Sequence, residues 1–251
     1  MEFLTDMSDR FAIRGFKSYQ PNQYQLLTVK DLQKDEAAII EVLYAIKNKE
    51  LRNDMVLLNY YKELPISFGA TVESIERGVV DVKVHRLQTV AMMLQHMTFI
   101  KSDHLPYCVI AKVLKAKKEQ DIALLTQFSY ASVPSEQRKY VRVSVHDKVE
   151  ALFSCDQHLL RGKINDISYG GVAIIAPRED NLYTNAKGMA TLWLPAATLE
   201  IPGVLLRIEE QHSSVKYIVR LDMDPKNEII ISKFIFGQQI MILRELKDMC
   251  G

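Results

Sequence analysis

Residues 134–171 read PSEQRKYVRVSVHDKVEALFSCDQHLLRGKINDISYGG, and this stretch decides the fold and the site expected for the second half of the chain. An arginine pair, Arg138 and Arg142, opens it in the spacing R-x-x-x-R. Side chains four residues apart leave from one face of a strand or of a helical turn. Two planar guanidinium groups on one face suit a ligand with several phosphates or a guanine edge, because each donates two parallel hydrogen bonds.

The same stretch ends in the spacing D-x-S-x-x-G, formed by Asp166, Ser168 and Gly171. On a strand, Asp166 and Ser168 share a face because successive side chains alternate. A carboxylate accepts hydrogen bonds from N–H groups and a hydroxyl donates or accepts them, so the pair can read the rim of a purine. Gly170 and Gly171 are expected to let the backbone turn sharply and to let a flat ligand approach the main chain.

The order and spacing of the two motifs carry the signal, because each motif alone is common. A second R-x-x-x-R occurs at Arg10 and Arg14, and no D-x-S-x-x-G follows it at a similar distance. The full set, with strand-like sequence between its halves, is expected by chance in about one chain in a hundred or fewer.

At these residues the sequence resembles the PilZ domain family, the bacterial receptors for the second messenger cyclic di-GMP. The resemblance covers the second half of the chain and implies a six-stranded antiparallel barrel with a closing C-terminal helix. It implies that Arg138 and Arg142 clamp the phosphates and guanine faces of cyclic di-GMP. Asp166 and Ser168 would then contact a guanine, and Gly171 would leave room for it.

Three residues beside the motifs complete the ligand-binding set that the resemblance implies: Gln137, Lys139 and Gly170. In the family, the residue before the first arginine influences whether one nucleotide or a stacked pair binds, and Gln137 leaves both open. Cyclic di-GMP is the expected ligand, and no metal or other cofactor is expected.

The length of 251 residues predicts two domains of ordinary size. Residues 132–137 are polar, contain one proline and form the expected linker, so the predicted domains are 1–133 and 134–251. In the second domain, strands are expected at 140–145, 149–155, 159–167, 171–176, 189–194, 200–209 and 215–223.

A closing helix is expected after the last strand, with Asp224 as its N-cap, Pro225 at its first position and an end near Met249. Its apolar surface is broader than one small barrel needs, and it includes Ile230, Phe234, Met241, Leu243 and Leu246. Part of this surface is therefore expected to pack on the first domain or on a second subunit of a homodimer.

The first domain is expected to combine a helical extension with a small antiparallel barrel, which makes the whole chain mainly β with helices (α+β). Apolar residues recur at helical spacing from Asp35 to about Asn48 and again over 51–61, so two helices are predicted. After Pro65 the period becomes two, and strands are expected at 66–72, 80–84, 98–101, 107–115 and 121–130. This layout resembles YcgR-like proteins, in which a divergent PilZ-like barrel precedes the binding domain. The helical extension departs from that layout and is expected to contact a protein partner.

Composition and charge argue against several classes of protein. The 32 basic and 31 acidic residues lack the excess of a general nucleic-acid binder, and Trp193 is the single tryptophan for stacking. The three cysteines are far apart and the six histidines form no ligand pair, so neither a disulfide framework nor a metal site is expected. Met1–Arg10 lacks the apolar stretch of a signal peptide, and the apolar segment 229–243 is too short to span a membrane. A cytoplasmic protein without membrane insertion is expected.

These features predict a cyclic di-GMP receptor and not an enzyme, because no nucleophile with a base, P-loop or pair of catalytic carboxylates is recognisable. Ligand capture is expected to change the relative orientation of the domains and so to regulate a protein partner from motility, pilus or polysaccharide machinery. One alternative is a PilZ-fold protein-interaction module that works without nucleotide. In another, the arginines form surface ion pairs with Glu136, Asp147 or Glu150, and D-x-S-x-x-G is only an Asx-type turn.

Overall fold

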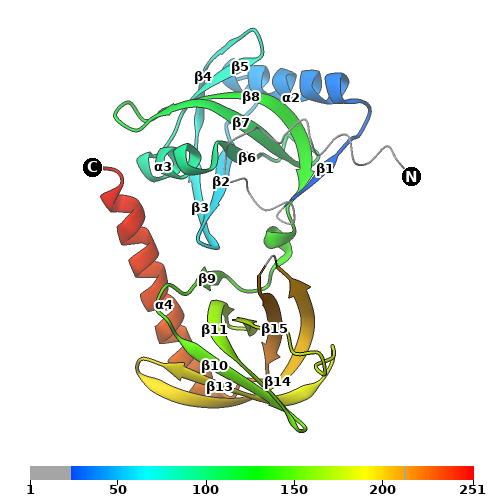
Figure 1. The fold of residues 1–251 in the computed structure, drawn as a ribbon. Coiled ribbons are helices and arrows are strands. Elements are labelled where there is room, and N and C mark those ends of the chain that lie inside the picture. The colour runs from blue at the N-terminus through cyan, green and yellow to red at the C-terminus, as the bar shows by residue number, and fades with distance from the viewer. Residues whose placement is uncertain (1–23, 212) are drawn as a thin grey trace. The chain divides into compact units, whose positions relative to one another are not determined.

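The computed structural model of the protein describes residues 24–211 and 213–251. The second arginine pair, Arg10 and Arg14, therefore lies outside the described residues, as does Met1–Arg10, the segment in which no signal peptide is expected. Where the structure describes the chain, strands predominate over helices (Figure 1), and the fold class is mainly β with helices, as predicted.

Contacts within the chain divide it into two compact units. Apart from the last two residues, the first unit contains the described residues up to 59 together with 66–137. The second contains residues 60–65 and 138–249. The domain boundary between 133 and 134 that the sequence suggests stays a prediction.

The first sheet is antiparallel and has eight strands among the described residues (Figure 1). Seven follow the order β3-β2-β6-β7-β8-β5-β4, and β1 pairs with β8. The strands span Gln25–Leu27 (β1), Val56–Tyr61 (β2), Leu64–Gly69 (β3), Thr71–Glu76 (β4), Val79–Lys83 (β5), Met97–Lys101 (β6), Cys108–Lys117 (β7) and Ile122–Ser132 (β8). The strands expected from the period-two pattern are therefore present, with β3 and β4 in place of one longer strand.

Helix α2, Leu32–Lys47, supplies one side of the core beneath this sheet. It begins because the side chain of its N-cap, Asp31, accepts a hydrogen bond from the backbone N–H of Lys34 at 2.9 Å. Ile39 and Leu43 then follow at helical spacing and are fully buried against strand residues such as Leu125. The first predicted helix is confirmed.

The second predicted helix, over 51–61, is wrong, because Val56–Tyr61 forms β2 and pairs with β6. Its run of apolar residues is buried on consecutive positions, and such a short run does not distinguish a strand from a helix by its period. A helix forms instead at Arg86–Gln95 (α3), which the sequence reasoning did not predict. Its N-cap, His85, accepts a hydrogen bond from the backbone N–H of Leu87 at 3.2 Å.

A buried polar network connects α3 to the first sheet. The amide oxygen of Asn59 in β2 accepts hydrogen bonds from Gln88 Nε2 at 2.6 Å and from Thr98 Oγ1 at 2.8 Å. Its amide nitrogen donates to Gln95 Oε1 at 2.6 Å and to the carbonyl of Met97 at 2.7 Å. A buried amide needs such partners because an unsatisfied polar group is costly away from water, so the network fixes α3 against β2 and β6.

The second sheet closes into a six-stranded antiparallel barrel, as predicted. The ring order is β10-β13-β14-β15-β12-β11, and β11 pairs with β10 to close it. A short extra strand, β9, pairs with β11 outside the ring. The strands span Arg142–Ser144 (β9), Glu150–Cys155 (β10), His158–Ser168 (β11), Gly171–Ala176 (β12), Lys187–Leu194 (β13), Ala197–Glu210 (β14) and Val215–Leu221 (β15).

Tyr217 is the largest fully buried side chain of this barrel, and its hydroxyl fixes the segment that follows β12. The hydroxyl accepts from the backbone N–H of Glu179 at 2.7 Å and donates to the carbonyl of Pro177 at 3.2 Å. The aromatic ring therefore contributes to the core, while the hydroxyl satisfies two backbone groups that lie outside the strand pairing.

Tyr217→Phe is expected to lower the free energy of unfolding by about 1–3 kcal/mol, because it removes the partner of two backbone groups and leaves the ring in place. Urea denaturation measures this change. Tyr183→Phe is the matched control, since Tyr183 is 56% exposed, and its effect should stay within about 0.5 kcal/mol. Equal stabilities of the two variants would contradict this role of the hydroxyl.

Helix α4, Pro225–Asp248, follows β15, and the closing helix is confirmed with its N-cap. The side chain of Asp224 accepts from the backbone N–H of Asn227 at 2.7 Å. One face of α4 is buried and contains Ile231, Ile235, Gln238, Ile242 and Leu246. Ile229, Phe236 and Met241 are exposed, so the apolar surface is indeed broader than the buried face.

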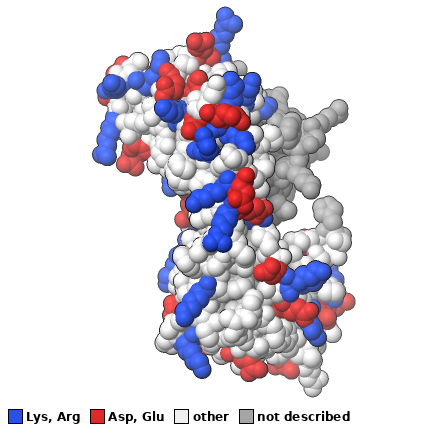
Figure 2. Space-filling view, turned by 90° about the vertical axis from the view of Figure 1, so that its left-hand side faces the viewer, with Lys and Arg blue, Asp and Glu red and all other residues white. Residues whose placement is uncertain are grey.

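Lys and Arg side chains are interspersed with Asp and Glu on the face of the molecule that Figure 2 shows, in keeping with the nearly even charge balance. Within the described part of the chain, no helix is both long enough and apolar enough to cross a membrane.

Candidate ligand-binding site

A β-bulge in β11 turns the polar residues of the second motif away from the barrel core. The pairing register with β12 shifts between Ile164 and Asp166, so Asn165 is the extra residue. Ile164 and Ile167 are both buried, at 3% and 0% exposure, although residues three apart point to opposite faces of a regular strand. After the bulge the side chains alternate again, but shifted by one residue, so that Ile167 points into the core. Asp166 and Ser168 therefore lie on the outer face of the barrel.

Strand pairing then brings the two motifs together across β9, β11, β12 and β15. Directly paired residues point to the same face of a sheet. One row across the four strands contains Arg142, Ser168, Gly171 and Arg220. The next row contains Ser144, Asp166, Ala173 and Ile218. The pairing of β9 with β11 thus places the first motif beside the second.

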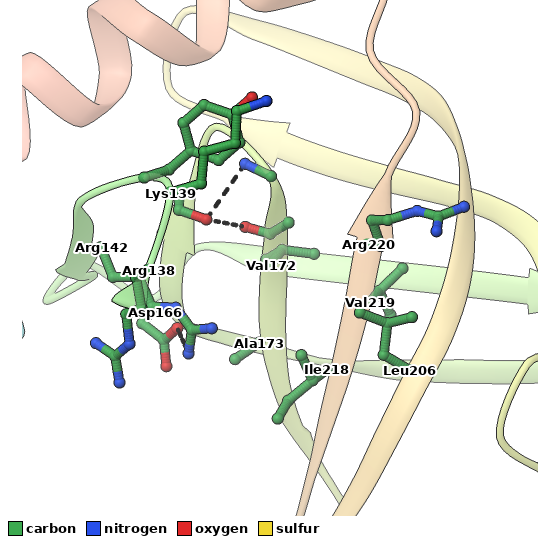
Figure 3. Close-up of a pocket in the computed structure, with 14 residues that line it drawn as sticks. Arg138, Lys139, Arg142, Asp166, Val172, Ala173, Leu206, Ile218, Val219 and Arg220 are labelled. Atoms are coloured by element: carbon green, nitrogen blue, oxygen red, sulfur yellow. Dashed lines mark hydrogen bonds and ion pairs between the residues drawn. The ribbon is translucent and has the colours of Figure 1, made fainter. Parts of the chain in front are cut away.

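A cavity of about 170 Å³ opens over these rows (Figure 3). Seven of the eight residues predicted from the sequence line it: Arg138, Lys139, Arg142, Asp166, Ser168, Gly170 and Gly171. The eighth, Gln137, is the exposed last residue of the 3-10 turn Pro134–Gln137 and is not among the lining residues. The ligand-binding role of all eight stays a prediction.

Several lining residues come from outside both motifs. Ala173, Leu206 and Ile218 provide an apolar floor, and Arg220 lies across the cavity from Arg138 and Asp166 (Figure 3). The sequence reasoning missed Leu206, Ile218 and Arg220 because they reach the cavity through the pairing of β14 with β15 and of β15 with β12, and no local motif records that register.

Arg142 of the first motif experiences opposing electrostatic effects. Burial lowers the pKa of Arg142 from its ordinary value, and the nearby Arg138 guanidinium lowers it further, whereas Asp166 and Glu63 act in the opposite direction. Burial and the charge of Arg138 both disfavour the charged form of Arg142, because burial removes hydration and like charges repel. An anion in the cavity would relieve this repulsion.

Arg138 is paired with a carboxylate in the second unit. Its Nη1 donates to Oε2 of Glu63 at 2.6 Å, and both side chains are partly exposed. Two of the three carboxylates that the alternative interpretation names have other cationic partners, since Glu136 pairs with Lys101 and Glu150 pairs with Arg161.

Asp166 is a buried carboxylate surrounded by donors. Lys216 Nζ lies 2.8 Å from Oδ2, and Asn165 Nδ2 donates to the same oxygen at 2.9 Å. The other oxygen, Oδ1, lies 4.0 Å from Nη1 of Arg142, which is beyond hydrogen-bonding distance. Oδ1 can therefore still accept from a ligand. Lys216 was not predicted, because it lies on β15, about fifty residues after the motif that it contacts.

The Ser168 hydroxyl is engaged locally, which agrees in part with the interpretation of the motif as a turn. It accepts from the backbone N–H of Gly170 at 3.3 Å and donates to the carbonyl of Gly171 at 3.4 Å. These are long hydrogen bonds, so a ligand with a better-placed donor or acceptor can replace them.

Gly170 and Gly171 lie at the turn between β11 and β12, and the structure gives a reason for glycine at 171 that the sequence did not predict. The chain does turn sharply here, because Ser168 pairs directly with Gly171, but neither Gly170 nor Gly171 has a positive φ, so the turn does not use the left-handed conformation that favours glycine. A Cβ at Gly171 would lie 2.4 Å from the carbonyl oxygen of Val219, because β12 and β15 approach closely there. A Cβ at Gly170 would meet only the ring of Tyr140, at 3.0 Å. Gly171 is therefore required by the sheet itself.

The fold and the cavity define this part of the chain as a closed six-stranded β-barrel with a cationic cavity on its outer face. Residues 136–237 match the family model of the PilZ domain, so this part of the chain is a PilZ domain. No group of His, Cys, Asp and Glu among the described residues is arranged to hold a metal.

Solved structures with a similar fold include Escherichia coli YcgR in complex with c-di-GMP, which is 13% identical, covers 92% of this chain and 99% of its own, and has a TM-score of 0.43. The K. pneumonia MrkH–c-di-GMP complex is 14% identical, and the match covers 89% of this chain and 100% of the MrkH chain, with a TM-score of 0.45. The Bacillus subtilis inhibitor of motility, MotI, is 14% identical, and the match covers 74% of this chain and 95% of the MotI chain, with a TM-score of 0.40. At such low identities these similarities describe the fold alone. No curated protein matches the chain.

Proposed function

We propose that the cavity of the PilZ domain binds cyclic di-GMP and that the protein is a receptor for this second messenger. The observation that carries the proposal is that both motifs, R-x-x-x-R and D-x-S-x-x-G, line one cavity within a PilZ domain. In this proposal Arg138 and Arg142 clamp the phosphates and stack on guanine, while Asp166 and Ser168 contact a guanine edge.

The charges around the cavity suit a dianionic ligand. Four cationic side chains line it, namely Arg138, Lys139, Arg142 and Arg220, and Asp166 is the one carboxylate among the lining residues. A cyclic dinucleotide carries two phosphate charges, and each guanidinium can form charge-assisted hydrogen bonds to phosphate oxygens. The carboxylate is compatible with the same ligand because guanine presents N–H donors.

The size of the cavity suits one base. Its volume of about 170 Å³ is close to the ~150 Å³ of an engineered cavity that holds a single benzene ring. Guanine is larger than benzene, so one guanine enters in part over the apolar floor of Ala173 and Ile218, and the phosphates lie at the arginines. The second guanine of the ligand stays at the surface or meets a second nucleotide, so either stoichiometry is compatible with this volume.

Binding also requires Arg138 to exchange its partner. Arg138 Nη1 donates to Oε2 of Glu63 at 2.6 Å. A phosphate offers more acceptor oxygens than a carboxylate and brings a second charge within reach of Arg142, so exchange is favourable when the ligand arrives. Because Arg138 directly follows the turn Pro134–Gln137, the ligand acts on the segment that joins the two sequence-predicted domains.

The proposed output is regulation of a protein partner. A ligand shifts a population of conformations only by its difference in affinity for them, so a receptor needs at least two orientations of its domains with unequal affinity. Cyclic di-GMP thus selects one orientation, and the surface presented in that orientation binds a partner in motility, surface attachment or polysaccharide production. A PilZ-fold interaction module that ignores nucleotide would bind the same partner with or without the ligand.

Isothermal titration calorimetry with cyclic di-GMP tests the proposal, with GTP and cyclic AMP as controls. We expect saturable binding of cyclic di-GMP, and affinity for either control that is weaker by about tenfold or more, since a mononucleotide cannot engage both arginines and the acid together. The affinity should fall as salt rises from 50 to 500 mM, because partly exposed ion pairs are screened. Absence of binding at every salt concentration would instead favour the nucleotide-independent module.

A further inference from the structure

We propose that Lys216 is a positioning residue that orients the carboxylate of Asp166 for guanine recognition. The inference rests on the proposed binding of cyclic di-GMP. Lys216 belongs to neither motif and does not line the cavity, yet it makes the shortest ion-pair contact of Asp166. Its role is therefore to act through Asp166, without contact to the ligand.

The geometry divides the two oxygens of Asp166 between the protein and the cavity. Oδ2 receives Lys216 Nζ at 2.8 Å and Asn165 Nδ2 at 2.9 Å, so the protein occupies its acceptor positions. Oδ1 has Arg142 at 4.0 Å and keeps its acceptor capacity. A carboxylate held by two donors on one oxygen cannot rotate freely, and its other oxygen has a fixed direction.

Lys216 reaches the carboxylate along the outer face of the barrel. On β15 it lies two residues before Ile218, which belongs to the same row as Asp166. It therefore approaches Asp166 from the side opposite to the row that contains Arg142, Ser168 and Arg220. The Lys216 side chain is only 16% exposed and that of Asp166 only 5%, so the pair is little screened by solvent.

The lysine also determines which cations remain available for the ligand. A buried carboxylate needs a compensating charge, and Lys216 provides it at contact distance. Without Lys216, the nearest cation would be Arg142, which would move from 4.0 Å into contact with Asp166 and away from the ligand phosphates. Lys216 thus keeps Asp166 directed at the base and Arg142 directed at the phosphate.

The test compares Lys216→Met with wild type by calorimetry, using cyclic di-GMP and cyclic di-IMP, in which the base lacks the exocyclic amino group of guanine. We expect Lys216→Met to weaken cyclic di-GMP binding by about tenfold or more, as for the loss of a hydrogen bond to a charged group. The preference for cyclic di-GMP over cyclic di-IMP should fall as well, and Lys216→Arg should restore part of both. A lysine that only stabilises the barrel would lower affinity without changing this preference.

Lys163→Met is the matched control, because Lys163 lies in the same row of the sheet as Lys216, through Ile175, and is exposed. Its affinity and preference should equal those of wild type. In an Asp166→Asn background, adding Lys216→Met should change neither value further, and this double variant also leaves no lone buried charge if the single variant fails to fold. A further loss in that background would overturn the positioning role.

The outcomes separate the two proposals. If wild type binds no cyclic di-GMP, the proposed function fails and the role of Lys216 fails with it. If wild type binds and Lys216→Met keeps both its affinity and its preference, the receptor assignment stands and the positioning role is refuted.

Discussion

Arg142→Ala is expected to abolish binding of cyclic di-GMP while the barrel stays folded. Arg142 begins β9, lines the cavity and is paired across the sheet with Ser168. Hydrogen bonds to charged groups contribute about 1.5–3 kcal/mol each, so loss of a two-pronged contact weakens binding by roughly a hundredfold or more. Calorimetry measures the affinity, and thermal unfolding measures the stability.

Stability should change little in Arg142→Ala, by about 1 kcal/mol or less for a partly exposed pair. The reason is that Asp166 keeps Lys216 at 2.8 Å, while removal of Arg142 ends its repulsion with Arg138. Arg161→Ala is the matched control, since Arg161 pairs with Glu150 and does not line the cavity. Tight binding by a folded Arg142→Ala variant would refute the clamp.

Gly171→Ala is expected to cause the largest loss of stability among single-methyl changes in the turn between β11 and β12. The added Cβ would lie 2.4 Å from the carbonyl oxygen of Val219 and 3.3 Å from Cα of Arg220, and both atoms belong to the paired strand β15. Backbone cannot yield as a side chain does, so we expect a loss of about 1–3 kcal/mol or more, measured by urea denaturation.

Gly170→Ala serves as the control for that change, because it adds the same methyl one residue earlier. There the Cβ would meet the ring of Tyr140 at 3.0 Å, and this exposed side chain can turn aside. The stability of Gly170→Ala should stay within about 0.5 kcal/mol of wild type. If the two variants were equally stable, the close approach of β12 and β15 at Gly171 would not be the reason for the glycine.

The second half of the chain was predictable because its local signals agree with its fold. β12 was expected at Gly171–Ala176 and has those bounds, and the acid and proline at 224 and 225 cap α4 as expected. Alternation and capping are properties of neighbouring residues, so sequence alone records them. The first half was harder because β2 is a short apolar run that fits a helix as well as a strand, and α3 begins at a histidine N-cap.

The site residues that belong to the two sequence motifs could be predicted. Those that reach the site through the pairing register of the strands could not. The two motifs predicted the residues that line one side of the cavity, whereas Arg220 reaches the cavity and Lys216 reaches Asp166 through the pairing of β15 with β12. Pairing register is set by the whole barrel, and a single strand does not encode it. The expected turn at Gly170 and Gly171 is present, but the reason for the glycine at 171 was hidden in the same way, since the limit on its size is imposed by the neighbouring strand β15.

The extra residue Asn165 ties the bulge of β11 to the recognition chemistry through its own side chain, which donates to Asp166. An insertion at the β10–β11 hairpin, near Asp156, would extend a solvent-facing tip and leave the binding surface as it is. Deletion of Asn165 would remove the bulge and make Ile164 and Asp166 neighbours in a regular strand, so the isoleucine would still face the core and the acid would still face the cavity. The loss would be the amide that donates to Oδ2 of Asp166 at 2.9 Å, so this position bears on ligand choice through the identity of its residue, and engineered libraries of this barrel should vary that identity before the length of the strand.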